Sequence, residues 1–149
     1  MSVKSQQANM KRLAFLLSKP LGYIYGKRES GPNGEKAEFH AKGRAFLRAL
    51  AKDLELRDYR VHSNYAGIAV SGEVCLYGMW SDGNGLMLWL EQSSIGSEVA
   101  VYRSIKNMKD STGGRNHFIS LSALRSEDYH LLISRLLRLR QEDAHGRAA

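Results

Sequence analysis

A run of polar and basic residues, NMKDSTGGRNHF, has the composition of an anion-binding loop. Its two consecutive glycines can take positive φ at little cost, so successive backbone N–H groups can turn toward one bound anion. The basic and hydrogen-bonding side chains around them can donate to a phosphate or a carboxylate. The candidate anion-binding residues of this run are Lys109, Gly113, Gly114, Arg115, Asn116 and His117.

The same run is also explained as a long hairpin connection. In that interpretation the glycines serve only the turn, and the side chain of Asp110 or Asn107 caps it. A P-loop is excluded, because the Gly-x-x-x-x-Gly-Lys-Ser/Thr pattern is absent and we expect a strand, not a helix, to follow. The sequence leaves the turn and the anion site as two open interpretations.

His117 can exchange a proton near neutral pH, which raises the question of catalysis. Lys109 and Arg115 could stabilise charge beside it, and a tyrosine such as Tyr102 or Tyr129 could donate a proton. Such a set would serve a metal-independent ribonuclease. No pair of these residues has a spacing that requires catalysis, so a protein without enzymatic activity is the preferred interpretation.

We expect no metal and no cofactor. The five histidines contain no H-x-x-x-H pair, and a single cysteine cannot form a structural zinc site. A nucleophile-elbow motif is also absent from the sequence. Cys75 lies in an apolar run, which predicts a buried thiol and not a reactive one.

The net charge of +7 favours an anionic partner, either nucleic acid or an acidic protein surface. No apolar run approaches the ~20 residues of a membrane helix, and no secretory signal is recognisable, so we expect a cytoplasmic protein without a membrane partner. The second helix places three basic residues away from its apolar stripe. These further candidates for phosphate contact are Lys42, Arg44 and Arg48.

The chain, residues 1–149, has the length and composition of one domain. Apolar periodicity predicts an α+β fold: an antiparallel β meander of about five strands, packed on one face by two N-terminal helices and a C-terminal helix. The expected helices cover residues 6–18, 35–54 and, after an N-cap at Ser126, up to Gln141. Strands are expected near 59–63, 66–70, 73–80, 86–92, 98–105 and 117–121. A mobile loop is expected at 27–34 and a frayed tail at 142–149.

The central strands have two apolar faces if Trp80 pairs with Leu86. One face is aliphatic with one tryptophan, and it is the candidate core: Val74, Leu76, Trp80, Leu86, Leu88 and Leu90. The other face is rich in aromatic residues and methionine: Tyr77, Met79, Met87 and Trp89. This second face has three explanations: cover by the outer strands or the N-terminal segment, a homodimer or partner interface, or a platform on which bases stack.

The preferred functional prediction is a small, basic, non-enzymatic protein that binds an anionic partner, with nucleic acid held through its phosphates as the best fit. One alternative is a protein-binding inhibitor or accessory subunit of a nucleic-acid-handling complex, using the aromatic face. The ribonuclease-like enzyme centred on His117 is the other.

Overall fold

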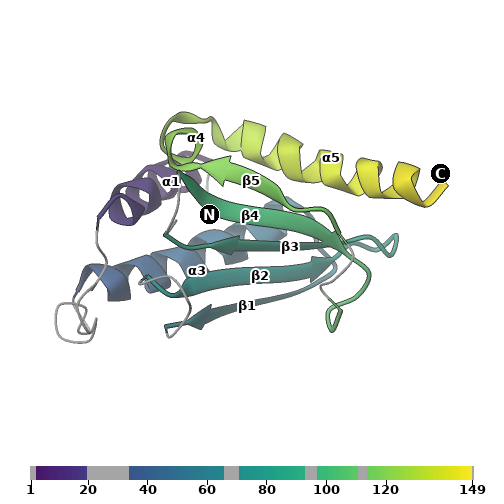
Figure 1. Ribbon diagram of the computed structural model, residues 1–149, viewed down its shortest axis with the longest axis horizontal. Helices are drawn as coiled ribbons and strands as arrows, with labels where there is room; N and C mark the ends of the chain where they lie inside the picture. Colours follow the sequence, from purple (N-terminus) through teal and green to yellow (C-terminus); the bar gives the residue numbers. More distant parts are fainter. Residues whose placement is uncertain (1–2, 20–33, 66–70, 93–96, 111–113, 149) are drawn as a thin grey trace.

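The computed structural model describes residues 3–19, 34–65, 71–92, 97–110 and 114–148, with side chains as far as residue 141. Four helices and five strands lie within these residues and form an α+β fold (Figure 1). The helices are α1 (Val3–Leu17), α3 (Glu35–Asp53), α4 (Leu121–Ser126) and α5 (Tyr129–Ala148). The strands are β1 (Asp58–Asn64), β2 (Glu73–Met79), β3 (Gly85–Leu90), β4 (Glu98–Ile105) and β5 (His117–Ser120).

The five strands form one antiparallel sheet in the order β1-β2-β3-β4-β5, so the predicted meander is confirmed. The predicted pairing of Trp80 with Leu86 is wrong. Leu86 lies opposite Gly78, and the backbone N–H of Trp80 donates to the carbonyl of Asn84. This register differs from the predicted one by two residues, so every side chain keeps the face it was assigned. The strand predicted at 66–70 lies outside the described residues.

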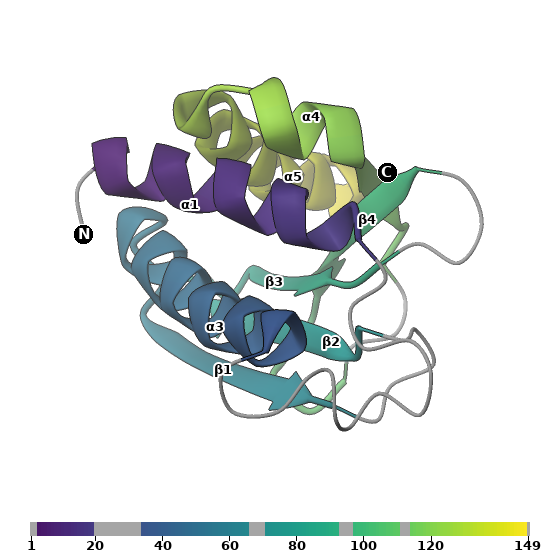
Figure 2. The ribbon, with the colours of Figure 1, turned by 90° about the vertical axis from the view of Figure 1, so that its left-hand side faces the viewer.

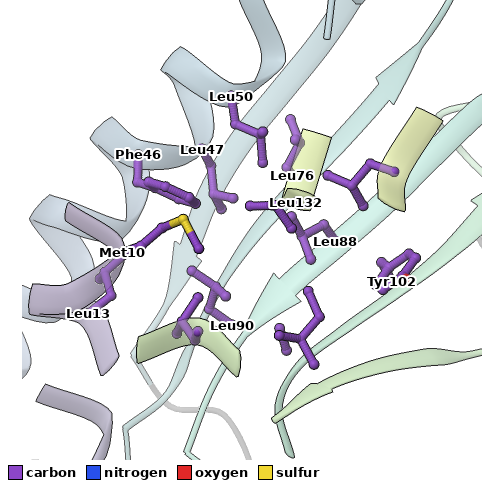
Figure 3. Close-up of a cluster of buried hydrophobic side chains, with 14 of the residues drawn as sticks. Met10, Leu13, Phe46, Leu47, Leu50, Leu76, Leu88, Leu90, Tyr102 and Leu132 are labelled. Atoms are coloured by element: carbon purple, nitrogen blue, oxygen red, sulfur yellow. The ribbon is translucent and has the colours of Figure 1, made fainter. Parts of the chain in front are cut away.

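The helices form one layer on the aliphatic face of the sheet. In Figure 1, α1 and α3 lie behind the strands, and Figure 2 shows α1 between α3 and α4. α5 contacts β3 and β4. Leucines and aromatic residues from both layers meet in one buried cluster (Figure 3), which includes Met10, Leu13, Phe46, Leu47, Leu50, Leu76, Leu88, Leu90, Tyr102 and Leu132.

A buried polar network joins three of the helices. Gln6 on α1 donates from Nε2 to the carbonyl of Phe46 on α3 and to the hydroxyl of Tyr129 on α5. The Tyr129 hydroxyl in turn donates to Asp53 Oδ2 at 2.6 Å. Because these hydrogen bonds connect sequence-distant helices, they help to fix how the helices pack.

The C-terminal region contains two helices where the sequence predicts one. Ser120 caps α4, since its hydroxyl accepts from the backbone N–H of Ala123, and Asp128 caps the start of α5 by accepting from His130 N. Ser126 is therefore not the N-cap that the sequence predicts. The helical backbone of α5 continues to Ala148, beyond the predicted end near Gln141.

Of the loop predicted to be mobile at 27–34, only Gly34 lies within the described residues, where it is the N-cap of α3. Glu35 and Glu38 occupy the first turn of α3 and Lys52 its last turn, as the helix dipole favours. This agreement of charge and position explains why α3 is the element that the sequence predicts most closely.

Candidate nucleic-acid interface

The sheet face opposite the helices has its own small cluster of apolar side chains, which we call the open face. Met79, Met87 and Ile105 are buried in it, with Tyr77 and Trp89 packed against them and partly exposed. Within the described part of the chain, every helix packs on the other side. The four residues predicted for the second face therefore lie together, and the two methionines are more deeply buried than the two aromatic side chains.

One row of opposing residues crosses the open face from β1 to β4. Arg60 lies opposite Tyr77, Tyr77 opposite Met87, and Met87 opposite Arg103. Directly opposed residues of an antiparallel sheet lie on the same face with their Cβ atoms about 5 Å apart. An arginine therefore stands at each end of this row.

A second row lies beside the first and crosses all five strands. It consists of His62, Cys75, Trp89, Val101 and Phe118. Phe118, on the edge strand β5, is 54% exposed, which is high for a phenylalanine in a sheet. Exposed aromatic rings on a sheet offer flat apolar surfaces to a partner.

The rings and guanidinium groups of the two rows contact one another in defined geometries. The His62 and Tyr77 rings are stacked, with centroids 5.6 Å apart and planes 6° apart. The Arg60 guanidinium lies 5.3 Å from the Tyr77 ring centroid, and that of Arg103 lies 5.4 Å from the Trp89 ring centroid. Cation–π contact holds each positive charge against an aromatic ring, so charge and stacking surface are presented together.

Burial shifts the ionisation of several groups on this face. It raises the pKa of Tyr77, and it raises the pKa of Cys75 to about 12. The Cys75 thiol is thus protonated at neutral pH, and the prediction of a buried thiol is confirmed. Burial also raises the pKa of Glu91, whose carboxylate accepts a long hydrogen bond of 3.4 Å from Trp89 Nε1.

The open face has four members that the sequence analysis missed: Arg60, His62, Arg103 and Phe118. They belong to β1, β4 and β5, and only their pairing with the central strands places them beside Tyr77 and Trp89. The available signal was the alternation of side chains along each strand, since successive side chains point to opposite faces of the sheet. That signal needs the register between strands, which the sequence did not supply.

The first residues of the predicted anion-binding run form a turn. Asn107 Oδ1 accepts from the backbone N–H groups of Lys109 and Asp110, each at 2.9 Å, as the turn interpretation expects. Gly114 is needed for close approach, because a Cβ there would lie 2.2 Å from the Ser104 carbonyl oxygen. Gly113 lies outside the described residues.

The basic side chains of this run remain near the open face. Met108 packs against the apolar cluster of the open face, so its neighbour Lys109, which is exposed, lies at that end of the open face. Arg115 and Asn116 are also exposed. These three residues follow β4 or directly precede β5, so they lie at one end of the sheet, beside the open face.

The cations of α3 do not join the same surface. Arg44 donates to Ser63 Oγ near the end of β1, whereas Lys109 follows the end of β4 that lies at the same end of the sheet as the start of β1. Lys42 is half-buried and Arg48 exposed on the helical layer. Arg44 and Lys109 thus lie at opposite ends of the sheet, and the three cations of α3 belong to the helical layer.

His117 lies apart from the rest of the run. Its ring stacks on Tyr102, with centroids 5.1 Å apart, and both residues line a pocket between the sheet and α5. The other lining residues are Arg135, Arg138 and Leu139. Of the residues proposed for a ribonuclease, His117 and Tyr102 share the pocket, whereas Lys109 and Arg115 are not among its lining residues.

Within the described residues, no cluster of three or more His, Cys, Asp or Glu side chains could hold a metal ion, and no helix has both the length and the apolar character to cross a bilayer. Comparisons with protein-family models, with curated proteins and with solved structures find no match to this chain. The geometry of the open face is therefore the basis for a functional proposal.

Proposed function

We propose that the protein binds single-stranded nucleic acid on the open face of its sheet, without catalysing a reaction. The observation that supports this proposal is the pairing of partly exposed rings with guanidinium groups across the sheet. The rings belong to His62, Tyr77, Trp89 and Phe118, and the guanidinium groups to Arg60 and Arg103.

The spacing of the rings suits unpaired bases. Neighbouring strands lie about 4.8 Å apart, so Trp89 on β3 and Phe118 on β5 are separated by roughly 10 Å across the sheet. Bases splayed out of a single strand can stack on such separate platforms, whereas the bases of a duplex are already stacked on each other. A single-stranded ligand follows from this spacing.

The charge around the rings suits the phosphates that join those bases. Arg60 and Arg103 stand at the two ends of one row, and Lys109 and Arg115 add positive charge beyond Met108. Every base has a flat face and every phosphate a negative charge, so the proposed binding has little sequence preference and weakens with salt. The cations of α3 are not part of this site.

The same face would also suit an acidic protein or a second copy of the chain, because Trp, Tyr and Met are enriched in the cores of protein interfaces. The nucleic-acid proposal is preferred because Arg60 and Arg103 place positive charge at both ends of a row of this face, which matches a ligand that carries one phosphate per base. A cytoplasmic location, as the sequence predicts, belongs to the proposal.

Fluorescence anisotropy with labelled single-stranded RNA, single-stranded DNA and duplex DNA tests the proposal. Phe118→Ala is the informative variant, and Phe15→Ala is its control, because Phe15 on α1 is similarly exposed, at 45%, on the helical layer. Loss of one stacking platform costs about 1–3 kcal/mol, so we expect Phe118→Ala to weaken single-strand binding roughly 5- to 150-fold. Phe15→Ala should bind as wild type.

The salt dependence gives an independent readout. Replacing Arg103 by Gln should lower the slope of log K against log salt by about 0.7, the contribution of one phosphate contact on a single strand. No binding at low salt would refute the proposal, and so would equal affinities for Phe118→Ala and Phe15→Ala. A concentration-dependent dimer in light scattering that is lost in Phe118→Ala would assign the open face to a second copy.

A further inference from the structure

A pocket lies on the helical side of the sheet, beneath the edge strand β5. It measures about 230 Å³ and is lined by Tyr102 and His117 from the sheet and by Arg135, Arg138 and Leu139 from α5. Two arginines, a histidine and a tyrosine thus line one cavity. Their side chains include hydrogen-bond donors and positive charge, which suit the oxygens of a phosphate.

The pocket lies next to one end of the open face. His117 and Phe118 are consecutive in β5, and successive side chains of a strand point to opposite faces. Phe118 therefore stands on the open face while His117 lines the pocket. β5 is the edge of the sheet, so no further strand lies between the two surfaces in the described structure. A chain that crosses the open face to Phe118 needs only to pass around this edge to reach His117.

Arg135 is held in place at the pocket wall. Its guanidinium bonds to Glu127 at 2.6 Å, which raises the pKa of Arg135, and its buried Nε has no hydrogen-bond partner within the described residues. Glu127 offsets one positive charge. Arg138 lies three residues further along α5, on the same side of the helix, and is exposed. The pocket therefore holds Arg138, which forms no ion pair within the described residues, beside an oriented, partly neutralised Arg135.

We propose that this pocket binds a terminal phosphate monoester of the single strand that lies on the open face; the inference rests on the proposed function. A terminal monoester carries a charge between −1.5 and −2 near pH 7, by analogy with phosphorylated side chains whose second pKa is about 6, whereas an internal phosphodiester carries one. Arg138 and Arg135 interact more favourably with a monoester, because it has that extra negative charge and one more free oxygen. The cavity has room for the phosphate together with part of its sugar, because it is several times the ~30 Å³ that a water occupies in the liquid.

The test compares oligonucleotides of one sequence that carry a 5′-phosphate, a 3′-phosphate or hydroxyl groups at both ends. We expect one of the phosphorylated forms to bind about 10-fold more tightly than the hydroxyl form, equivalent to about 1.4 kcal/mol, and the better end identifies the direction of the strand. Arg138→Gln should remove this preference and leave the affinity for the hydroxyl form unchanged. The control is Arg125→Gln, because Arg125 is exposed on α4 and does not line the pocket.

Failure of this inference is distinguishable from failure of the proposed function. Equal affinities for all three oligonucleotides, with binding still weakened by Phe118→Ala, would overturn the terminal-phosphate pocket alone. A nucleoside 5′-monophosphate and a nucleoside 3′-monophosphate, each too short to span the sheet, provide the second measurement. One of them should shift the NMR resonances of the His117 ring in wild type and not in Arg138→Gln. No shift with either would overturn the pocket even if no oligonucleotide binds the open face.

Discussion

The buried histidine of α3 should make the stability of the fold depend on pH. His40 has no exposed surface, and its Nε2–H donates to the Ser71 carbonyl at 2.8 Å. The Tyr65 ring stacks on it at a centroid distance of 3.8 Å, and Phe39 meets it edge-on. Its other ring nitrogen, Nδ1, has no hydrogen-bond partner within the described residues, so a proton added there would be buried without an acceptor.

These surroundings lower the pKa of His40 from 6.5 to about 4. Burial is the largest cause, and the positive charges of Lys36 and Arg44 act in the same direction, while the hydrogen bond to Ser71 opposes them. The unfolded chain binds a proton on this residue below pH 6.5, and the folded protein does so only near pH 4. Stability is therefore complete above pH 6.5 and decreases as the pH falls through that window.

The size of the effect follows from the two pKa values. Between pH 7 and pH 5, the free energy of unfolding should fall by about 2 kcal/mol because of His40 alone, at 1.36 kcal/mol per pKa unit of difference. Urea denaturation at the two pH values, for wild type and His40→Gln, measures this loss. The variant cannot titrate here, so its stability should change by about 2 kcal/mol less than that of wild type.

His130→Gln is the matched control, because His130 is an exposed histidine on α5 and its replacement should leave the wild-type pH dependence in place. Equal losses of stability for wild type and His40→Gln would refute the reasoning. That result would mean that the histidine is protonated in the folded state as readily as in the unfolded chain.

Three further predictions concern residues that the fold holds in place. Tyr129→Phe removes the hydroxyl that joins Gln6 to Asp53 and should lower the free energy of unfolding by about 1–2 kcal/mol in urea; an unchanged stability would show that the network contributes nothing. Gly114→Ala places a methyl group against the Ser104 carbonyl and should cost about 1–3 kcal/mol in the same assay; an unchanged stability would contradict this close approach. Cys75, with its pKa raised to about 12, should resist a thiol reagent in the native protein and react once urea unfolds it; rapid native reaction would contradict its burial.

The fold was predictable because its signals are local. Apolar stripes at helical spacing mark α1 and α3, and alternation marks the strands, so two layers follow once the elements are known. The faces of β2 and β3 were correct although the register was not, since a shift of two residues preserves alternation. The hairpin turn comprises residues 81–83 and is shorter than expected, because the backbone N–H of Trp80 donates to the Asn84 carbonyl and closes it.

The C-terminal helices show where local signals compete. Ser126 is followed by two acidic residues, Glu127 and Asp128, which is the usual composition of a helix start. A serine six residues earlier, Ser120, begins a short helix first, and the cap of the next helix passes to Asp128. The prediction failed because nearby residues of equal capping ability are distinguished only by how the chain packs against β5 and α1.

The candidate site was only half predictable, for a different reason. Tyr77 and Trp89 lie on central strands and could be assigned to the second face from alternation alone. Arg60, Arg103 and Phe118 join them only through strand pairing, which is a property of the whole sheet. The net charge does not show where the basic residues lie in the fold. The sequence analysis therefore combined the cations of α3 with those of the run 107–118 in one predicted site, although the sheet separates the two groups.

The division of each central strand between two faces has a consequence for how this protein can change. In β2, Val74 and Leu76 belong to the core that holds the fold together, while their neighbours Cys75 and Tyr77 belong to the open face. Substitutions at the exposed positions of the open face can thus alter what the protein binds without a large loss of stability. Evolution, or a designer building a surface library, can retune ligand preference on this sheet while the alternate positions keep the scaffold intact.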